Sequence, residues 1–155
     1  MVNALSRTLT VEVARDKQLW RQSYERGVPS GPPVKDSAVH NRRGTSISFL
    51  PDPEIFEAGA AFDAQRVYRM ARSKAYLFRG VEIRWSCDPS LIKPGDDTPD
   101  KDTIHFPGGL ADFLNSALAD RECATPTPFI GQAGFSKKQD GEMEWAVAWP
   151  LPGDG

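Results

Sequence analysis

The residues best suited to chemistry in this chain form a short strand after a basic turn, over residues 44–49. Side chains alternate between the two faces of a strand, so Thr45, Ile47 and Phe49 share one face. A threonine hydroxyl that opens an otherwise apolar strand face is well placed to meet a ligand at the end of the strand. The alternative is that Thr45 only starts the strand and that its hydroxyl bonds to the backbone. On this feature alone both interpretations stay open.

The composition is that of an ordinary folded protein. The 155 residues are 39% hydrophobic and 26% charged, which is enough for one domain or one and a half with a real core. The formal net charge of -2 argues against a basic nucleic-acid surface, so we expect any contact with DNA to be made elsewhere. No apolar run has the length of a membrane span, and the first residues lack the basic and apolar regions of an export signal.

The cysteines and histidines give no metal signature. Cys87 and Cys123 stand far apart, and neither His40 nor His105 lies at ligand spacing from them. We therefore expect two free thiols in a reducing cytoplasm, and no metal ligand in this chain.

The first third of the chain predicts β-structure. Apolar and polar residues alternate from Thr8 to Arg15, and Asp16-Lys17 can form a two-residue turn, so residues 8–25 predict a β-hairpin. Residues 28–43 are rich in Pro, Gly and Ser at their start and show no period, which predicts a surface loop. The double proline at residues 51–53 is expected to end the strand that carries Thr45.

Two helices are predicted from apolar spacing near 3.6 residues. Asp63 is expected to cap a helix that runs to about Leu77, and a second helix follows the glycines at 108–109. The predicted core residues of the first helix are Phe62, Val67, Met70, Ala71 and Ala75, and those of the second are Leu110, Phe113, Leu114, Ala117 and Leu118. The basic residues of the first helix are interpreted as solvated rather than as an anion site.

Four further strands are predicted, over residues 81–85, 104–106, 128–132 and 142–149, with a turn over residues 136–141. The acidic insert at residues 88–103 lacks EF-hand spacing and is interpreted as an exposed loop. The strand at residues 142–149 has an apolar face that needs partner strands. We take this, with an isolated helical turn at residues 2–6, to indicate a piece of a longer protein.

Seven segments in order carry a family resemblance. They are residues 2–6, 20–27, 44–56, 72–83, 108–110, 128–131 and 144–149, among them Gly44-Thr45 and Phe49-Leu50-Pro51-Asp52-Pro53-Glu54-Ile55-Phe56. In these segments the chain resembles the ATPase region of bacterial type IIA topoisomerase B subunits, topoisomerase IV more than gyrase. The resemblance covers nearly the whole chain.

The resemblance implies an α/β fold. It would be the second half of a Bergerat (GHKL) ATPase two-layer sandwich with a mixed sheet over residues 1–107, followed by the start of the transducer domain over residues 108–155. It also implies ATP and Mg²⁺ as cofactors of the full-length protein and a cytoplasmic location. The implied partners are DNA, the A subunit and a second B subunit.

The resemblance also implies roles for three residues. Thr45 matches the threonine that lies under the adenine and reads the base together with an aspartate and a water. A hydroxyl can both donate and accept, and Ile47 on the same face can offer an apolar wall. Arg15 matches the arginine at the mouth of the nucleotide pocket, which meets coumarin-type inhibitors in this family.

The family's catalytic residues have no match in this chain. Its general-base glutamate, its Mg²⁺-binding asparagine, its adenine-binding aspartate and its Gly-rich lid lie upstream of the position matching Met1. We therefore expect a segment of an ATP-dependent type II topoisomerase that does not turn over ATP alone. One alternative is a catalytically inactive truncated product that acts as a binding or dimerisation module. Another, an unrelated small α/β binding protein, would make seven matches accidental.

Overall fold

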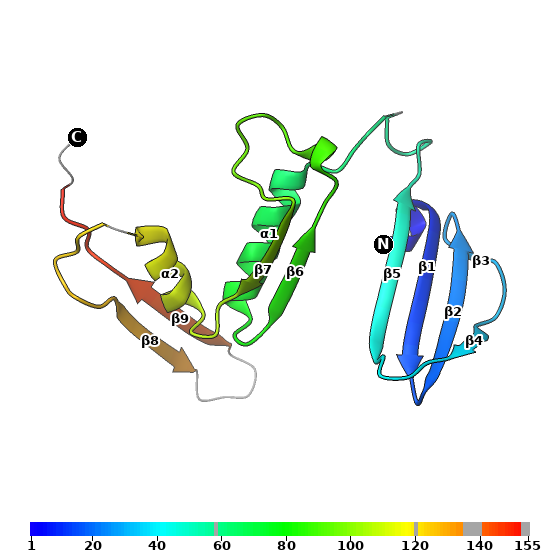
Figure 1. Ribbon diagram of the computed structural model, residues 1–155, viewed down its shortest axis with the longest axis horizontal. Coiled ribbons are helices and arrows are strands. Elements are labelled where there is room, and N and C mark those ends of the chain that lie inside the picture. The colour runs from blue at the N-terminus through cyan, green and yellow to red at the C-terminus, as the bar shows by residue number, and fades with distance from the viewer. Residues whose placement is uncertain (58, 120, 135–140, 153–155) are drawn as a thin grey trace. The chain divides into compact units, whose positions relative to one another are not determined.

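The protein folds into two compact units, Met1–Ala61 and Phe62–Gly155. The structure, a computed structural model, describes residues 1–57, 59–119, 121–134 and 141–152 (Figure 1).

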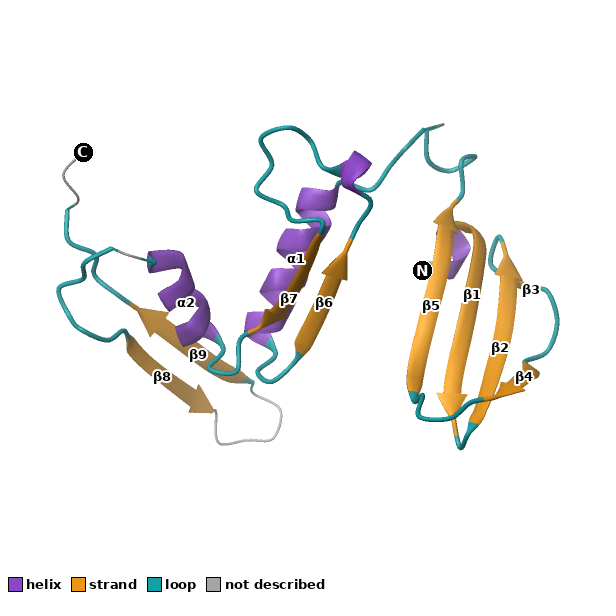
Figure 2. Cartoon of the chain, in the orientation of Figure 1, coloured by secondary structure: helices purple, strands orange, loops and turns teal. Residues whose placement is uncertain are grey.

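The first unit is an antiparallel sheet (Figure 2). Its elements are η1 (Asn3–Leu5), β1 (Ser6–Arg15), β2 (Gln18–Glu25), β3 (Val28–Pro29), β4 (Val34–Ala38) and β5 (Gly44–Pro51). Strand β1 lies between β2 and β5, while β3 and β4 pair with the other edge of β2 near its two ends. The long strand β1 is therefore the strand that joins β5 to β2 and its two short partners.

The predicted hairpin at residues 8–25 is confirmed as β1 and β2. Asp16 and Lys17 have φ angles of 52° and 60°, which is the left-handed backbone of the two-residue turns that suit twisted hairpins. The register runs from Thr8 opposite Glu25 to Arg15 opposite Gln18 without a bulge.

The prediction of a surface loop over residues 28–43 is wrong in part. Residues Val34–Ala38 form strand β4, which pairs with β2, and Val28–Pro29 form the short β3. All five side chains of β4 are exposed. An edge strand of this kind is held by backbone hydrogen bonds, so no alternation of apolar and polar residues marks it in the sequence.

Asp52 closes the first unit just after β5. Its backbone N–H donates to the Leu5 carbonyl at 3.1 Å, and its side chain is only 3% exposed. One carboxylate oxygen accepts from Glu54 N–H at 3.0 Å, and the other pairs with Arg26 Nε at 2.9 Å. Asp52 thus joins the end of β5 to the turn after β2 and to η1.

The second unit carries two helices, each beside a two-stranded antiparallel sheet (Figure 1). Its elements are α1 (Ala64–Leu77), β6 (Glu82–Ser86), η2 (Pro89–Leu91), β7 (Lys101–His105), α2 (Leu110–Leu118), β8 (Phe129–Gly134) and β9 (Glu142–Val147). The four predicted strands and two predicted helices are confirmed, with shifted ends. The predicted turn at 136–141 lies, apart from Gly141, outside the described residues.

Asp63 caps α1 as predicted, because its carboxylate accepts from Arg66 N–H at 2.9 Å. The predicted core face of α1 is confirmed at Ala75, which is buried, and Ala71 is half-buried, but it is wrong at Phe62, Val67 and Met70, which are exposed. The buried positions are Ala64 and Ala75.

The reason for the rotated core face is Tyr68. Its hydroxyl donates to Asp102 on β7 at 2.6 Å, and its ring centroid lies 5.6 Å from that of Trp85 on β6. Ala64, Tyr68 and Ala75 fall on one helical stripe, so these contacts turn that stripe toward the β6–β7 hairpin. The contacts of Tyr68, and not the apolar side chains of Val67 and Met70, determine which face of α1 packs against the hairpin.

Helix α2 packs with aromatic contacts. Four of its five predicted core residues are half-buried, while Ala117 is exposed. The Phe113 ring stacks on Tyr76 of α1 with centroids 4.1 Å apart. The predicted domain boundary at 107/108 falls inside this second unit, and it stays a prediction about the family's domains.

We expect Asp52→Ala to lower the free energy of unfolding of the first unit by about 1–3 kcal/mol, because the Glu54 N–H and the Arg26 guanidinium lose their acceptor. Amide hydrogen exchange of β1 and β2 measures this. The control is Glu54→Ala, which removes the exposed partner of the same arginine and should change stability by about 0.5 kcal/mol or less. Equal losses in the two variants would contradict a special role for Asp52.

Candidate functional site

The pairing of β5 with β1 sets the face on which Thr45 lies. Thr45 is opposite Val13, Ile47 opposite Val11, and Phe49 opposite Leu9. Residues directly opposite each other in an antiparallel pair project to the same side of the sheet. Leu9, Val11, Val13, Ile47 and Phe49 therefore form one apolar face, and Thr45 lies at its edge.

Arg15 belongs to the same side of the sheet. It follows Val13 by two positions in β1, so strand alternation places it on the apolar face. It lies at the strand end that also carries Thr45. Its guanidinium pairs with Asp16 at 3.5 Å, yet both side chains are more than three-quarters exposed, at 78% and 88%. Such an exposed pair is weak and leaves Arg15 available to a ligand.

The apolar face is open over much of its area. Ile47 is 59% exposed and Phe49 44%. A groove of about 440 Å³ runs along it, lined by Val2, Asn3, Leu9, Val11, Tyr24, Ile47 and Phe49. A concave apolar surface of this kind suits an apolar ligand group or a partner side chain. Thr45 stands beyond the Ile47 end of this groove.

Thr45 is exposed, and its hydroxyl makes no hydrogen bond to any residue that the structure describes. The alternative in which that hydroxyl is satisfied by the backbone therefore receives no support. A hydroxyl can donate one hydrogen bond and accept two, so this one retains its full capacity for a ligand or a water.

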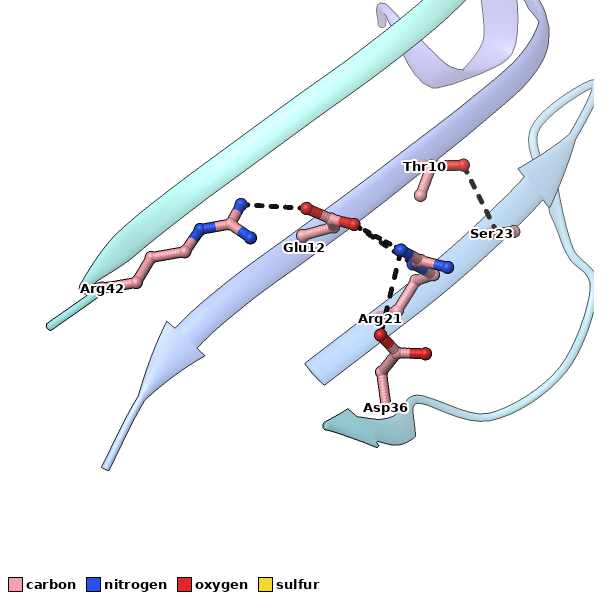
Figure 3. Close-up of polar contacts among 6 residues, drawn as sticks. All are labelled: Thr10, Glu12, Arg21, Ser23, Asp36 and Arg42. Carbon is pink, nitrogen blue, oxygen red and sulfur yellow. Dashed lines mark hydrogen bonds and ion pairs between the residues drawn. The ribbon is translucent and has the colours of Figure 1, made fainter. Parts of the chain in front are cut away.

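The opposite face of the sheet carries a charged cluster that sequence reasoning missed (Figure 3). Glu12 Oε1 accepts from Arg21 Nη2 at 2.7 Å and from Arg21 Nε at 3.2 Å, while Glu12 Oε2 accepts from Arg42 Nη2 at 2.9 Å. Arg21 also lies 3.9 Å from Asp36 of β4. Glu12, Arg21, Asp36 and Arg42 are called the Glu12 cluster below.

The two arginines lower the pKa of Glu12. The largest cause is the hydrogen bond from Arg21, followed by that from Arg42, and burial opposes both. The hairpin register places Arg21 directly opposite Glu12, so the contact between Glu12 and Arg21 can be predicted from the hairpin in the sequence. The Arg42 contact spans 30 positions and crosses a segment without periodicity, so no sequence pattern indicates it.

Among the described residues, no three His, Cys, Asp or Glu side chains are grouped so that they could hold a metal ion. These residues do not by themselves fit a Mg²⁺ site. Cys87 and Cys123 are free thiols. Neither helix, nor any other helical segment among the described residues, has the length and apolar character needed to cross a bilayer.

Comparison with known proteins gives relatives over almost all of the chain. The B subunit of DNA topoisomerase 4 from Caulobacter vibrioides is 48% identical over 155 residues, which are 100% of this chain and 22% of that protein. The corresponding protein of Bartonella bacilliformis is 45% identical over 149 residues, covering 96% and 21%. The B subunit of DNA gyrase from Chlamydia pneumoniae is 33% identical over 147 residues, covering 95% and 17%. No family model matches the chain.

Solved structures give the same grouping. The B subunit of Myxococcus xanthus DNA gyrase matches with a TM-score of 0.76 and 26% identity, covering 96% of this chain and 40% of that one. The 43K ATPase domain of Thermus thermophilus gyrase B, solved with an aminocoumarin, matches with a TM-score of 0.70 and 25% identity, covering 86% and 34%.

These matches define an α/β segment of the gyrase B type of ATPase fold, which confirms the expected fold class. Over nearly its whole length the chain is homologous to a segment of these B subunits, and its identity is higher to the topoisomerase 4 proteins above than to the gyrase protein. It spans about a fifth of the length of the curated relatives it matches.

The lowered pKa of Glu12 predicts a pH dependence of stability. A carboxylate whose folded pKa is depressed stabilises the fold above its unfolded pKa, and this contribution is lost as the pH falls through the folded value. We expect Glu12→Gln to be less stable than the parent at neutral pH, and the difference to shrink below the ordinary glutamate value of 4.5.

Urea unfolding of the parent and the variant across this pH range measures the difference. Asp36 is the second carboxylate within ion-pair distance of Arg21, so Asp36→Asn is measured alongside Glu12→Gln to separate the two contributions. Glu57→Gln, at an exposed position, is the matched control and should change nothing. A stability difference that does not vary with pH would contradict the assignment.

Proposed function

We propose that this chain provides the adenine-facing part of the nucleotide site in an ATP-dependent type II topoisomerase B subunit. The observation that carries the proposal is the Thr45 hydroxyl. It has no partner among the described residues and lies on the same sheet face as Ile47 and Arg15. The relative with an aminocoumarin in its ATPase domain supports a small-molecule site on this fold.

Each of the three residues has a role that its chemistry allows. The Thr45 hydroxyl would bond to the edge of the base directly or through a water, since it can donate and accept. Ile47 would pack against the flat face of the base, which removes apolar surface from water. Arg15, mostly exposed at the strand end, would lie at the mouth of the site and attract negatively charged ligand groups.

In the whole protein, bound ATP with Mg²⁺ would supply the phosphoryl chemistry that drives DNA strand passage. The partners proposed for that protein are DNA, the A subunit and a second B subunit, and the proposed location is the cytoplasm. We also propose that residues 1–107 are the later part of the ATPase domain and that residues 108–155 open the transducer. Two observations support this assignment. The chain is similar over nearly its whole length to topoisomerase 4 B subunits, and it resembles in fold a gyrase B ATPase domain.

The second candidate is a non-catalytic binding or dimerisation module. The open apolar groove beside Ile47 favours it, because such a surface also suits a protein partner. The two candidates differ in what Thr45 contributes. A nucleotide site needs its hydroxyl, whereas an apolar docking surface does not.

We expect Thr45→Ala to weaken nucleotide binding by roughly fivefold to thirtyfold, the loss of one hydrogen bond worth about 1–2 kcal/mol. The measurement is calorimetry with a non-hydrolysable ATP analogue and Mg²⁺, on a complete B subunit carrying this segment. Thr45→Ser keeps the hydroxyl and should retain most of the affinity.

The matched control is Thr8→Ala, a threonine of β1 on the opposite face. Thr8→Ala should bind nucleotide like the parent. Unchanged nucleotide binding in Thr45→Ala would refute the nucleotide role of Thr45 and would leave the binding or dimerisation module as the remaining candidate.

A further inference from the structure

Arg42 ties the segment before β5 to the centre of the sheet. It stands two residues ahead of Gly44, where β5 begins, and three ahead of Thr45. Its Nη2 donates to Glu12 Oε2 at 2.9 Å, and Glu12 lies in the middle of β1 (Figure 3). The contact therefore joins the incoming end of β5 to a strand that has neighbours on both sides.

The register places Glu12 close to the backbone that carries Thr45. Glu12 is opposite Ser46, the residue after Thr45, and the two project to the face away from the apolar groove. A contact on this side can hold the β5 backbone without occupying the face where Thr45 lies.

Glu12 is itself held in place. Its other oxygen accepts two hydrogen bonds from Arg21, and Arg21 lies within ion-pair distance of Asp36. The Glu12 cluster thus crosses β4, β2 and β1 and ends at the entry to β5 (Figure 3). A carboxylate fixed by one arginine presents its second oxygen to the other in a defined direction.

The backbone that enters β5 has an unusual conformation, since Asn41 has a φ of 59° and Gly44 a φ of 127°. Backbone of this kind is permissive at glycine, and it is fixed only when surrounding contacts fix it.

We infer that Glu12 and Arg42 form a positioning pair that fixes the start of β5 and so holds the Thr45 hydroxyl in its binding orientation. This inference rests on the proposed nucleotide role of Thr45. Neither residue of the pair touches the ligand. They act through the backbone between Arg42 and Ser46.

The expected effect is modest, because Arg42 and Glu12 are 48% and 21% exposed and solvent screens the pair. We expect Arg42→Ala to weaken nucleotide binding roughly twofold to fivefold, the range of a partly exposed ion pair. Arg42→Lys keeps the charge and should restore part of the affinity. Arg43→Ala is the matched control, since Arg43 has no ion pair within the described ranges, and it should bind like the parent.

The test is a double-mutant cycle on a complete B subunit carrying this segment, with calorimetry of a non-hydrolysable ATP analogue and Mg²⁺. If Arg42 acts through Thr45, Arg42→Ala weakens binding in the parent but adds little in the Thr45→Ala background. A general loss of folding would lower binding in both backgrounds. Glu12→Gln, which preserves the shape of the side chain, should repeat the pattern of Arg42→Ala.

The outcomes separate the two claims. If Thr45→Ala weakens binding while Arg42→Ala does not, or if the two effects simply add, the positioning pair is refuted and the role of Thr45 stands. If Thr45→Ala leaves binding unchanged, the proposed function is refuted and the positioning pair is refuted with it.

Discussion

The pairing register of β1 with its two neighbours is the constraint on which the site depends. Because side chains alternate along a strand, this register sends Leu9, Val11 and Val13 to one face and Glu12 to the other. A slip of β5 by one residue would turn Thr45 toward the charged side and place Ser46 on the apolar face. The ion pairs around Glu12 and the buried Asp52 after β5 both oppose such a slip.

The sequence predicts those features of the fold that depend on neighbouring residues, and it does not predict those that depend on distant partners or on backbone pairing alone. Thr45, Ile47 and Phe49 alternate, and so do the hairpin strands, so their common face was predictable. Asp63 is a capping residue of familiar type, and the structure confirms it. Strand β4 left no pattern because all its side chains are exposed. The face of α1 was misjudged because Tyr68 reaches Asp102, 34 residues away, and such a distant partner cannot be identified from helical periodicity.

The two faces of the first sheet differ in chemistry. The apolar face carries Ile47 and Phe49, with the Thr45 hydroxyl at its edge, and these are the groups that the proposed adenine site uses. The charged face offers directional contacts between strands, which apolar packing does not provide. Homology to the topoisomerase B subunits gives this arrangement a chemical context, since one of the matched structures is an ATPase domain solved with an aminocoumarin. The claim to test is that the apolar face of this sheet binds adenine.

A crystal structure of a complete B subunit carrying this segment, in complex with a non-hydrolysable ATP analogue and Mg²⁺, tests that claim most directly. The account predicts the adenine on the apolar face, with Ile47 against the ring and the Thr45 hydroxyl hydrogen-bonded to the base or to a water that the base binds. An adenine bound elsewhere, with the Thr45 hydroxyl taking no part, would contradict it.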